Sequence, residues 1–141
     1  MPFPLDKKFI DETEKELGVT FPKKFVQKML NDNGGEVSTD NDDWTLYPFF
    51  DKTDKKRISR TCNHIGLETK KAKEWTTFPG SGIAIGTNGT GDQLILLVDT
   101  TNDKILCEDI YIWKHETGDI VKVADSITEL ADINYDDQDE E

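Results

Sequence analysis

The sequence has few of the residues that build redox, metal or nucleophilic sites. Its two cysteines, Cys62 and Cys107, lie far apart, and neither has a second cysteine at the C-x-x-C spacing of zinc and redox centres. We therefore expect reduced, structural thiols and neither a metal nor another cofactor. His64 follows Cys62 by two residues, a spacing that points the side chains to different faces of a helix. The sequence thus gives no catalytic residue.

Long apolar runs and positive charge are also scarce. No apolar run approaches the roughly 18 residues of a membrane span, and "MPFPLDKKF" lacks the basic and apolar regions of a signal peptide. The 17 basic residues stand against 29 acidic ones, for a net charge of −12. This balance argues against direct binding to nucleic acid or anionic lipid and favours a partner with a basic surface. We expect a cytoplasmic protein that contacts no membrane.

The charge is unevenly distributed. Residues 52–73 hold eight Lys or Arg and only two acids. This asymmetry predicts an acidic face and a small basic one, although charge that serves only solubility explains it equally well.

Apolar periodicity predicts helices in the first part of the chain. Residues 5–17 have helical spacing, and Gly18 stands where a left-handed C-terminal cap belongs. A second helix is expected to begin near Pro22 and to end at "NGG". The following stretch "NDNGGEVSTDNDDW" is interpreted as a polar loop, and residues 51–78 as one or two helical pieces.

Strand patterns dominate the rest of the chain. "WTLYPFF" predicts a short strand, and "GIAIG", "DQLILLVD", "KILCEDIYIWKHE" and "DIVKVA" predict four more in an antiparallel meander, with "LILLV" at its centre. The spacing of Ser126 and Glu129 predicts a short C-terminal helix. The predicted fold is α+β: a central, mostly antiparallel sheet with N-terminal helices and a short C-terminal helix packed against it. We expect one domain over residues 1–133 and a flexible acidic tail over 134–141.

The loop "GTNGTGD", residues 86–92, has the glycines of a phosphate or metal loop but not the spacing. A P-loop requires Lys after its last glycine, a dinucleotide site requires a helix after the loop, and a calcium loop requires more acidic ligands. We interpret the loop as a hairpin turn. Asp92 then either caps the backbone of its turn or faces a partner.

Acidic residues surround one aromatic residue. Asp42 and Asp43 precede Trp44 in a loop that is too polar to desolvate a carboxyl group for acid–base catalysis. Ordinary solvated surface is one interpretation. Carboxylates beside an exposed aromatic also suit recognition of a basic protein patch, with Trp44 or Tyr47 as the anchor.

Three segments resemble the SUKH superfamily in the order of its signature. Residues 16–35, "ELGVTFPKKFVQKMLNDNGG", resemble its opening; "GIAIGTNGTGDQLILLVD" resembles its strand–Gly–Asp–strand element; "IYIWKHETGDIVKVADSITELA" resembles its closing strand, Trp-x-His-Glu turn and terminal helix. The resemblance implies the same α+β fold and a non-enzymatic role. Residues that match the family pattern are Gly34, Gly35, Gly91, Asp92, Trp113, His115 and Glu116.

The resemblance implies one of two roles. Family members include regulators of cell-wall assembly and bacterial immunity proteins that neutralise polymorphic toxins, often nucleases. The acidic chain favours an immunity protein that binds a cognate toxin with a basic surface. Its expected contact residues are Asp42, Asp43, Trp44, Asp92 and Glu116. A regulatory scaffold or small-ligand-binding module is the alternative, and an enzyme would require a deep pocket holding two carboxylates with raised pKa.

Overall fold

Helices precede most of the strands, as the periodicity predicts. The computed structural model describes residues 3–39 and 42–133. Its helices are α1, Lys7–Leu17; α2, Lys23–Asn31; α3, Lys55–Arg60; and α4, Ile65–Ala72. The Asp6 side chain accepts a hydrogen bond from the Lys8 amide at the start of α1, and Gly18 ends the helix at a φ of 72°. The helical pieces predicted for residues 51–78 are α3 and α4.

Seven strands form one sheet in the order β6-β5-β4-β3-β2-β1-β7, and every neighbouring pair is antiparallel. The strands are β1, Glu36–Ser38; β2, Asp43–Leu46; β3, Gly82–Thr87; β4, Gln93–Leu97; β5, Ile110–Trp113; β6, Ile120–Ala124; and β7, Ala131–Asp132. Leu94, Ile95 and Leu96 of β4 are fully buried. This burial confirms that the apolar "LILLV" strand is central.

Three details differ from the sequence predictions. The stretch interpreted as a polar loop contains β1, in which Val37 is the only buried residue. The predicted C-terminal helix is a single 3-10 turn, Ile127–Glu129, because the chain pairs with β1 from Ala131 onward. The strand predicted for "KILCEDIYIWKHE" begins only at Ile110, since Ile105 and Leu106 form isolated bridges.

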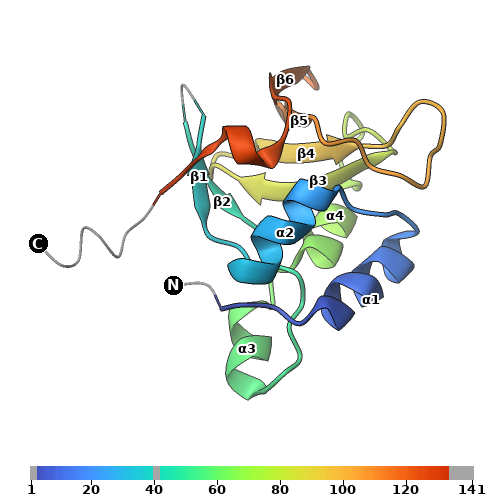
Figure 1. The fold of residues 1–141 in the computed structure, drawn as a ribbon. Helices are drawn as coiled ribbons and strands as arrows, with labels where there is room; N and C mark the ends of the chain where they lie inside the picture. Colours follow the sequence, from blue (N-terminus) through green and yellow to red (C-terminus); the bar gives the residue numbers. More distant parts are fainter. Residues whose placement is uncertain (1–2, 40–41, 134–141) are drawn as a thin grey trace, which may run out of the picture.

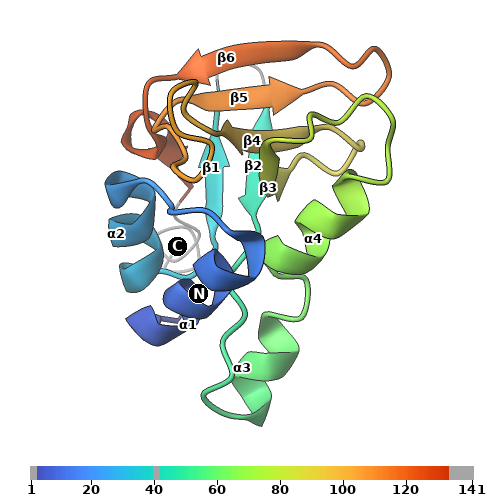
Figure 2. The same cartoon turned by 90° about the vertical axis from the view of Figure 1, so that its right-hand side faces the viewer.

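The helices α1, α2 and α4 lie on the same side of the sheet, and α3 lies at the far end of the molecule from β5 and β6 (Figure 1, Figure 2). Phe21, Phe25 and Phe49 pack ring to ring between helix and sheet, with centroids 5.0–6.0 Å apart. The α+β fold is therefore confirmed. Within the described ranges, no helix is both long and apolar enough to cross a membrane. The proposed tail, residues 134–141, lies outside the described residues.

A β-bulge interrupts the pairing of β5 with the edge strand β6, between Ile110 and Tyr111. On β6, Ile120 and Val121 are 40% and 44% exposed. The next residue of β6 is Lys122, whose Nζ lies 2.7 Å from Asp125 Oδ1 and 3.4 Å from Asp109 Oδ1.

Candidate protein-binding surface

Acidic loops gather at one end of the sheet. Because neighbouring strands run in opposite directions, the connections β1–β2, β3–β4 and β5–β6 all lie at the same end. They carry Asp42, Asp43, Asp92, Glu116 and Asp119, against one cation, Lys114, among the described residues. We call residues 42–43, 88–92 and 114–119 the acidic loop end. The fold therefore brings together all four acidic residues that the sequence analysis selected.

The glycine-rich segment is a hairpin turn between β3 and β4, as predicted. Gly89 and Gly91 have φ values of 86° and 109°, which side-chain-bearing residues rarely adopt. Asn88 connects this turn to the β1–β2 connection, because its Nδ2 donates a 2.7 Å hydrogen bond to Asp42 Oδ2. Asn88 Oδ1 also accepts hydrogen bonds from the amide and hydroxyl of Thr90. Two of the acidic loops thus hold each other in place.

Asp92 connects the same turn to the β5–β6 turn. Its Oδ1 accepts hydrogen bonds from the backbone amide of His115 at 3.1 Å and from the ring Nδ1 at 2.6 Å. A Cβ atom on Gly91 would lie 2.9 Å from the His115 ring. Gly91 is therefore required by its backbone angle and by this close approach, and Asp92 holds the neighbouring turn. These contacts explain physically why Gly91, Asp92 and His115 occur together.

An aromatic cluster supports the loop end from beside the sheet. Trp113 is 1% exposed, and its Nε1 donates a 3.1 Å hydrogen bond to the Thr77 carbonyl oxygen. Its ring meets Phe78 and Trp75 edge to face, at centroid distances of 5.1 and 6.1 Å. A Cβ atom on Gly118 would lie 2.8 Å from Thr77 Cβ. The segment after α4 is consequently held against the β5–β6 turn, which Figure 2 shows at the side of the sheet.

Trp75 is the exposed aromatic residue of this surface. It is 54% exposed, and its ring lies 5.9 Å from that of His115. Trp75 falls within residues 51–78, for which helical pieces are predicted, and it is not among the expected contact residues. Its surroundings in the sequence, "KAKEWTT", are as polar as those of the buried Trp44, so no local signal in the sequence marks Trp75 as exposed.

The expectation that Trp44 or Tyr47 is an exposed anchor is wrong. Trp44 is 1% exposed, and its Nε1 donates to Thr39 Oγ1 at 3.2 Å. It points inward because it shares the buried face of β2 with Leu46. Tyr47 is 5% exposed, and its hydroxyl donates to Gln93 Oε1 at 2.8 Å. Burial raises the pKa of the Tyr47 hydroxyl.

A hollow of about 580 Å³ opens beside the acidic loop end, with Asp42, Trp44, Asn88, Asp92, Lys114 and Lys122 among its lining residues. It brings three selected residues together. Asp43 and Glu116 instead point to solvent, and the Glu116 side chain is 83% exposed.

Hydrogen bonding to Asp125 raises the pKa of Lys122, so this cation is already paired. In the part of the chain that the structure describes, no three His, Cys, Asp or Glu residues are grouped to hold a metal ion.

Comparison with known proteins identifies a family over most of the chain. The model of the SMI1 / KNR4 family (SUKH-1) matches residues 4–132. No match was found among curated proteins or among solved structures. The match includes the "NGG" turn, the Gly91–Asp92 pair and the turn at His115, and it confirms the resemblance to the SUKH superfamily.

Proposed function

We propose that this chain, which belongs to the SMI1/KNR4 family (SUKH-1), is an immunity protein that binds and neutralises a cognate toxin. The observation that carries the proposal is the acidic loop end, with Trp75 exposed beside it. Immunity and cell-wall regulation are the two roles associated with the family. The acidic loop end favours immunity, because toxins that act on nucleic acid present cationic surfaces. The protein would act by contact rather than by catalysis, and in the cytoplasm.

The two kinds of side chain have different tasks in this proposal. The exposed carboxylates of Asp43 and Glu116 attract the basic toxin surface and orient the encounter. Trp75 enters a pocket of the toxin and excludes water from the centre of the contact. Its edge contacts with Trp113 and His115 hold the ring before binding, which reduces the entropy lost on association.

Co-expression with the toxin domain encoded beside the gene tests the proposal. We expect the chain to restore growth and to form a stoichiometric complex that high salt weakens. Trp75→Ala should weaken that complex by about 10- to 100-fold, as for a buried aromatic anchor. Ile58→Ala is the matched control, because Ile58 is also exposed, at 40%, but lies on α3. The proposal is wrong if growth is not restored, or if both substitutions have the same effect.

A further inference from the structure

A surface of opposite charge lies around α3. Residues 51–60 contain five cations and two acids in a chain whose net charge is −12. We call Lys52, Lys55, Lys56, Arg57 and Arg60 the basic cluster. It lies away from β5 and β6, toward the opposite end of the molecule (Figure 2). A separate surface of this sign is not needed to attract a cationic toxin, so it calls for another explanation.

Most of these cations are not neutralised by acids. Lys52 pairs with Glu12 at 2.7 Å, whereas Lys55, Lys56 and Arg60 form no ion pair within the described ranges. Arg60, Lys56 and Arg57 instead lie over the Phe3 ring, with centroid distances of 5.0, 5.6 and 4.6 Å. Three of the five cations of the basic cluster are therefore gathered over the Phe3 ring. Two of these three, Lys56 and Arg60, keep their charge available to a partner.

Arg57 adds a second observation. Its Nε is buried and has no hydrogen-bond partner in the described part of the structure. Arg57 lies within ion-pair distance of two carboxylates: its Nε is 3.9 Å from Asp51 Oδ2, and its Nη1 is 3.8 Å from Asp54 Oδ2. The other oxygen of Asp51, Oδ1, accepts hydrogen bonds from the Thr53 amide and hydroxyl. Asp51 is 1% exposed, and its backbone amide donates a hydrogen bond to Thr61 Oγ1. Nε of Arg57 is therefore a buried donor whose hydrogen-bonding capacity the described side chains do not meet.

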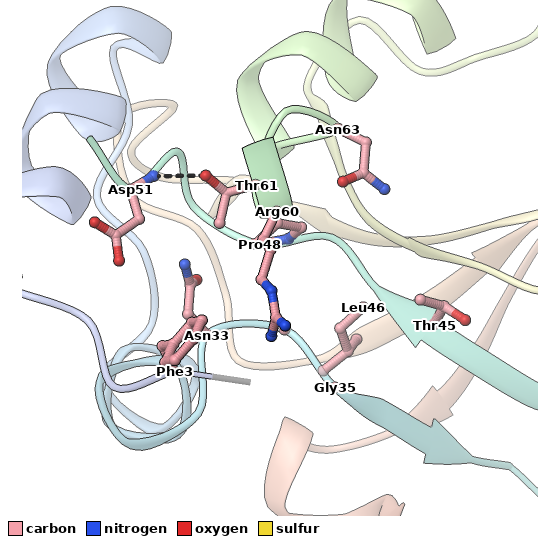
Figure 3. Close-up of a pocket in the computed structure, with 11 residues that line it drawn as sticks. Phe3, Asn33, Gly35, Thr45, Leu46, Pro48, Asp51, Arg60, Thr61 and Asn63 are labelled. Atoms are coloured by element: carbon pink, nitrogen blue, oxygen red, sulfur yellow. Dashed lines mark hydrogen bonds between the residues drawn. The ribbon is translucent and has the colours of Figure 1, made fainter. Parts of the chain in front are cut away.

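A pocket opens next to the basic cluster (Figure 3). Its volume is about 280 Å³, and it lies between Phe3, Arg60, the glycines at 34 and 35, and the apolar side chains of Leu46 and Pro48. Figure 3 shows the Arg60 side chain extending into the space between Phe3 and Leu46. Asn33 also lines the pocket, but its side-chain amide is hydrogen-bonded to the backbone of Phe49 in both directions.

The size and lining of the pocket limit what it accepts. Small-molecule sites begin at about 300 Å³, so this one suits a single large side chain better than a free cofactor. Its walls are mostly apolar; Arg60 supplies positive charge at its edge, and the buried Asp51 is the acidic residue among those that line it. The matching ligand has an apolar or aromatic side chain with carboxylates close by.

We propose that the pocket and the basic cluster bind an acidic peptide segment of a second partner protein. One apolar or aromatic side chain enters the pocket, and flanking carboxylates contact Arg60, Lys56 and Arg57. A long nucleic acid is disfavoured, because the rest of the chain carries all of the net negative charge and repels a polyanion beyond the local cluster. A short peptide avoids this repulsion, because at physiological salt charges are screened beyond about 8 Å and the peptide would interact only with the nearby basic cluster.

Amide chemical-shift mapping on the full, ¹⁵N-labelled chain tests this site. The probe is a synthetic peptide with one Tyr flanked on each side by three Asp or Glu residues. We expect shifts at Gly34, Gly35, Thr61 and Asn63, and an affinity that falls with salt. Arg60→Glu should lower the affinity at least about tenfold, and Arg60→Gln by less, because the contact is both charged and hydrogen-bonded. Lys73→Glu is the matched control: it makes the same charge change at an exposed lysine outside the pocket.

Several outcomes would overturn the assignment. The first is that the pocket amides do not shift at about 1 mM peptide, which would mean a binding free energy weaker than about 4 kcal/mol. The second is that Lys73→Glu lowers the peptide affinity as much as Arg60→Glu does. The third is that a thymidine oligonucleotide binds more tightly than the peptide. A fourth concerns the chain's own residues 134–141, which carry five acids and Tyr135. If the peptide binds only after those five acids are changed to amides, the site belongs to the chain's own C-terminus. Arg60→Glu leaves the acidic loop end intact, so this proposal and the immunity proposal fail separately.

Discussion

At the scale of single residues, Gly91 decides how two neighbouring turns fit together. Its φ of 109° and the closeness of the His115 ring both exclude a side chain. We predict that Gly91→Ala destabilises the protein by at least about 1 kcal/mol more than Gly89→Ala in urea unfolding. The ring has to move and thereby weakens its 2.6 Å contact with Asp92.

Gly89→Ala is a matched control in the same turn. Gly89 has a φ of 86°, and nothing lies within 4 Å of the position of its Cβ atom. Its substitution therefore costs only the backbone strain, about 1–2 kcal/mol. Equal losses for the two variants would show that the approach of His115 to Gly91 has no energetic role.

The same scale shows why the acids of the binding surface were predictable and its aromatic residue was not. Asp42, Asp43 and Glu116 are recognisable because acidic side chains are almost never fully buried unless they are paired. Trp44 and Trp75 both stand among polar residues in the sequence. Only the pairing of β2 puts Trp44 opposite the buried Val37, whereas the edge contacts of Trp75 leave half of its ring outside. Contacts between segments distant in the sequence decide which of the two tryptophans is buried, and the local sequence pattern carries no information about those contacts.

At the scale of elements, helix α4 depends on the protonation state of its cap. His64 Nδ1 accepts a hydrogen bond from the Leu67 amide at 3.3 Å, which requires the neutral ring, and the ring stacks on Phe50. Burial lowers the pKa of His64, although Glu16 and Glu68 partly oppose this shift. The unfolded chain, with a His pKa of about 6.5, therefore binds the proton more readily than the folded one. Stability should fall as the pH decreases through and below that value.

His64→Asn separates this contribution from those of other titrating groups, because Asn also caps helices but does not titrate. We predict that the stability advantage of the parent protein over His64→Asn is larger at pH 7.5 than at pH 5. Urea unfolding at both pH values measures it. A difference that stays constant, or that grows toward low pH, would contradict the proposed role of the neutral ring.

The elements that sequence patterns predict well are those with several residues on a buried face. Helices α1 and α2 and strand β4 meet this condition. Strands β1 and β7 are three and two residues long, which is too short for an alternation to be visible. The capping box predicted for Ser126 and Glu129 does not form, because the Ser126 side chain makes no cap hydrogen bond; Glu129 Oε1 instead accepts a hydrogen bond from the amide of Asp125, the residue before the cap. The helical segment is only one turn long, because the residues after it pair with β1 as strand β7.

At the scale of the whole molecule, the separation of charge predicts how a toxin would associate. Asp43→Asn combined with Glu116→Gln should lower the association rate about 3- to 10-fold at low salt and change the dissociation rate little. Trp75→Ala should act mainly on dissociation, as an anchor does. Stopped-flow or surface-based kinetics would separate the two. At about 0.5 M salt the effect of the charge substitutions should disappear; if it persists there, long-range attraction is not their role.

The edge of the sheet has a consequence for behaviour at high concentration. An exposed strand with unpaired backbone groups invites a second copy to add to it and start an aggregate. On β6 the apolar pair Ile120 and Val121 would favour this, but Lys122 follows directly and the bulge at Tyr111 disturbs the flat register that stacking needs. A second molecule would have to bury that cation and adapt to the twist. Lys122 and the bulge therefore oppose the addition of a second copy along β6, although the strand exposes two apolar residues.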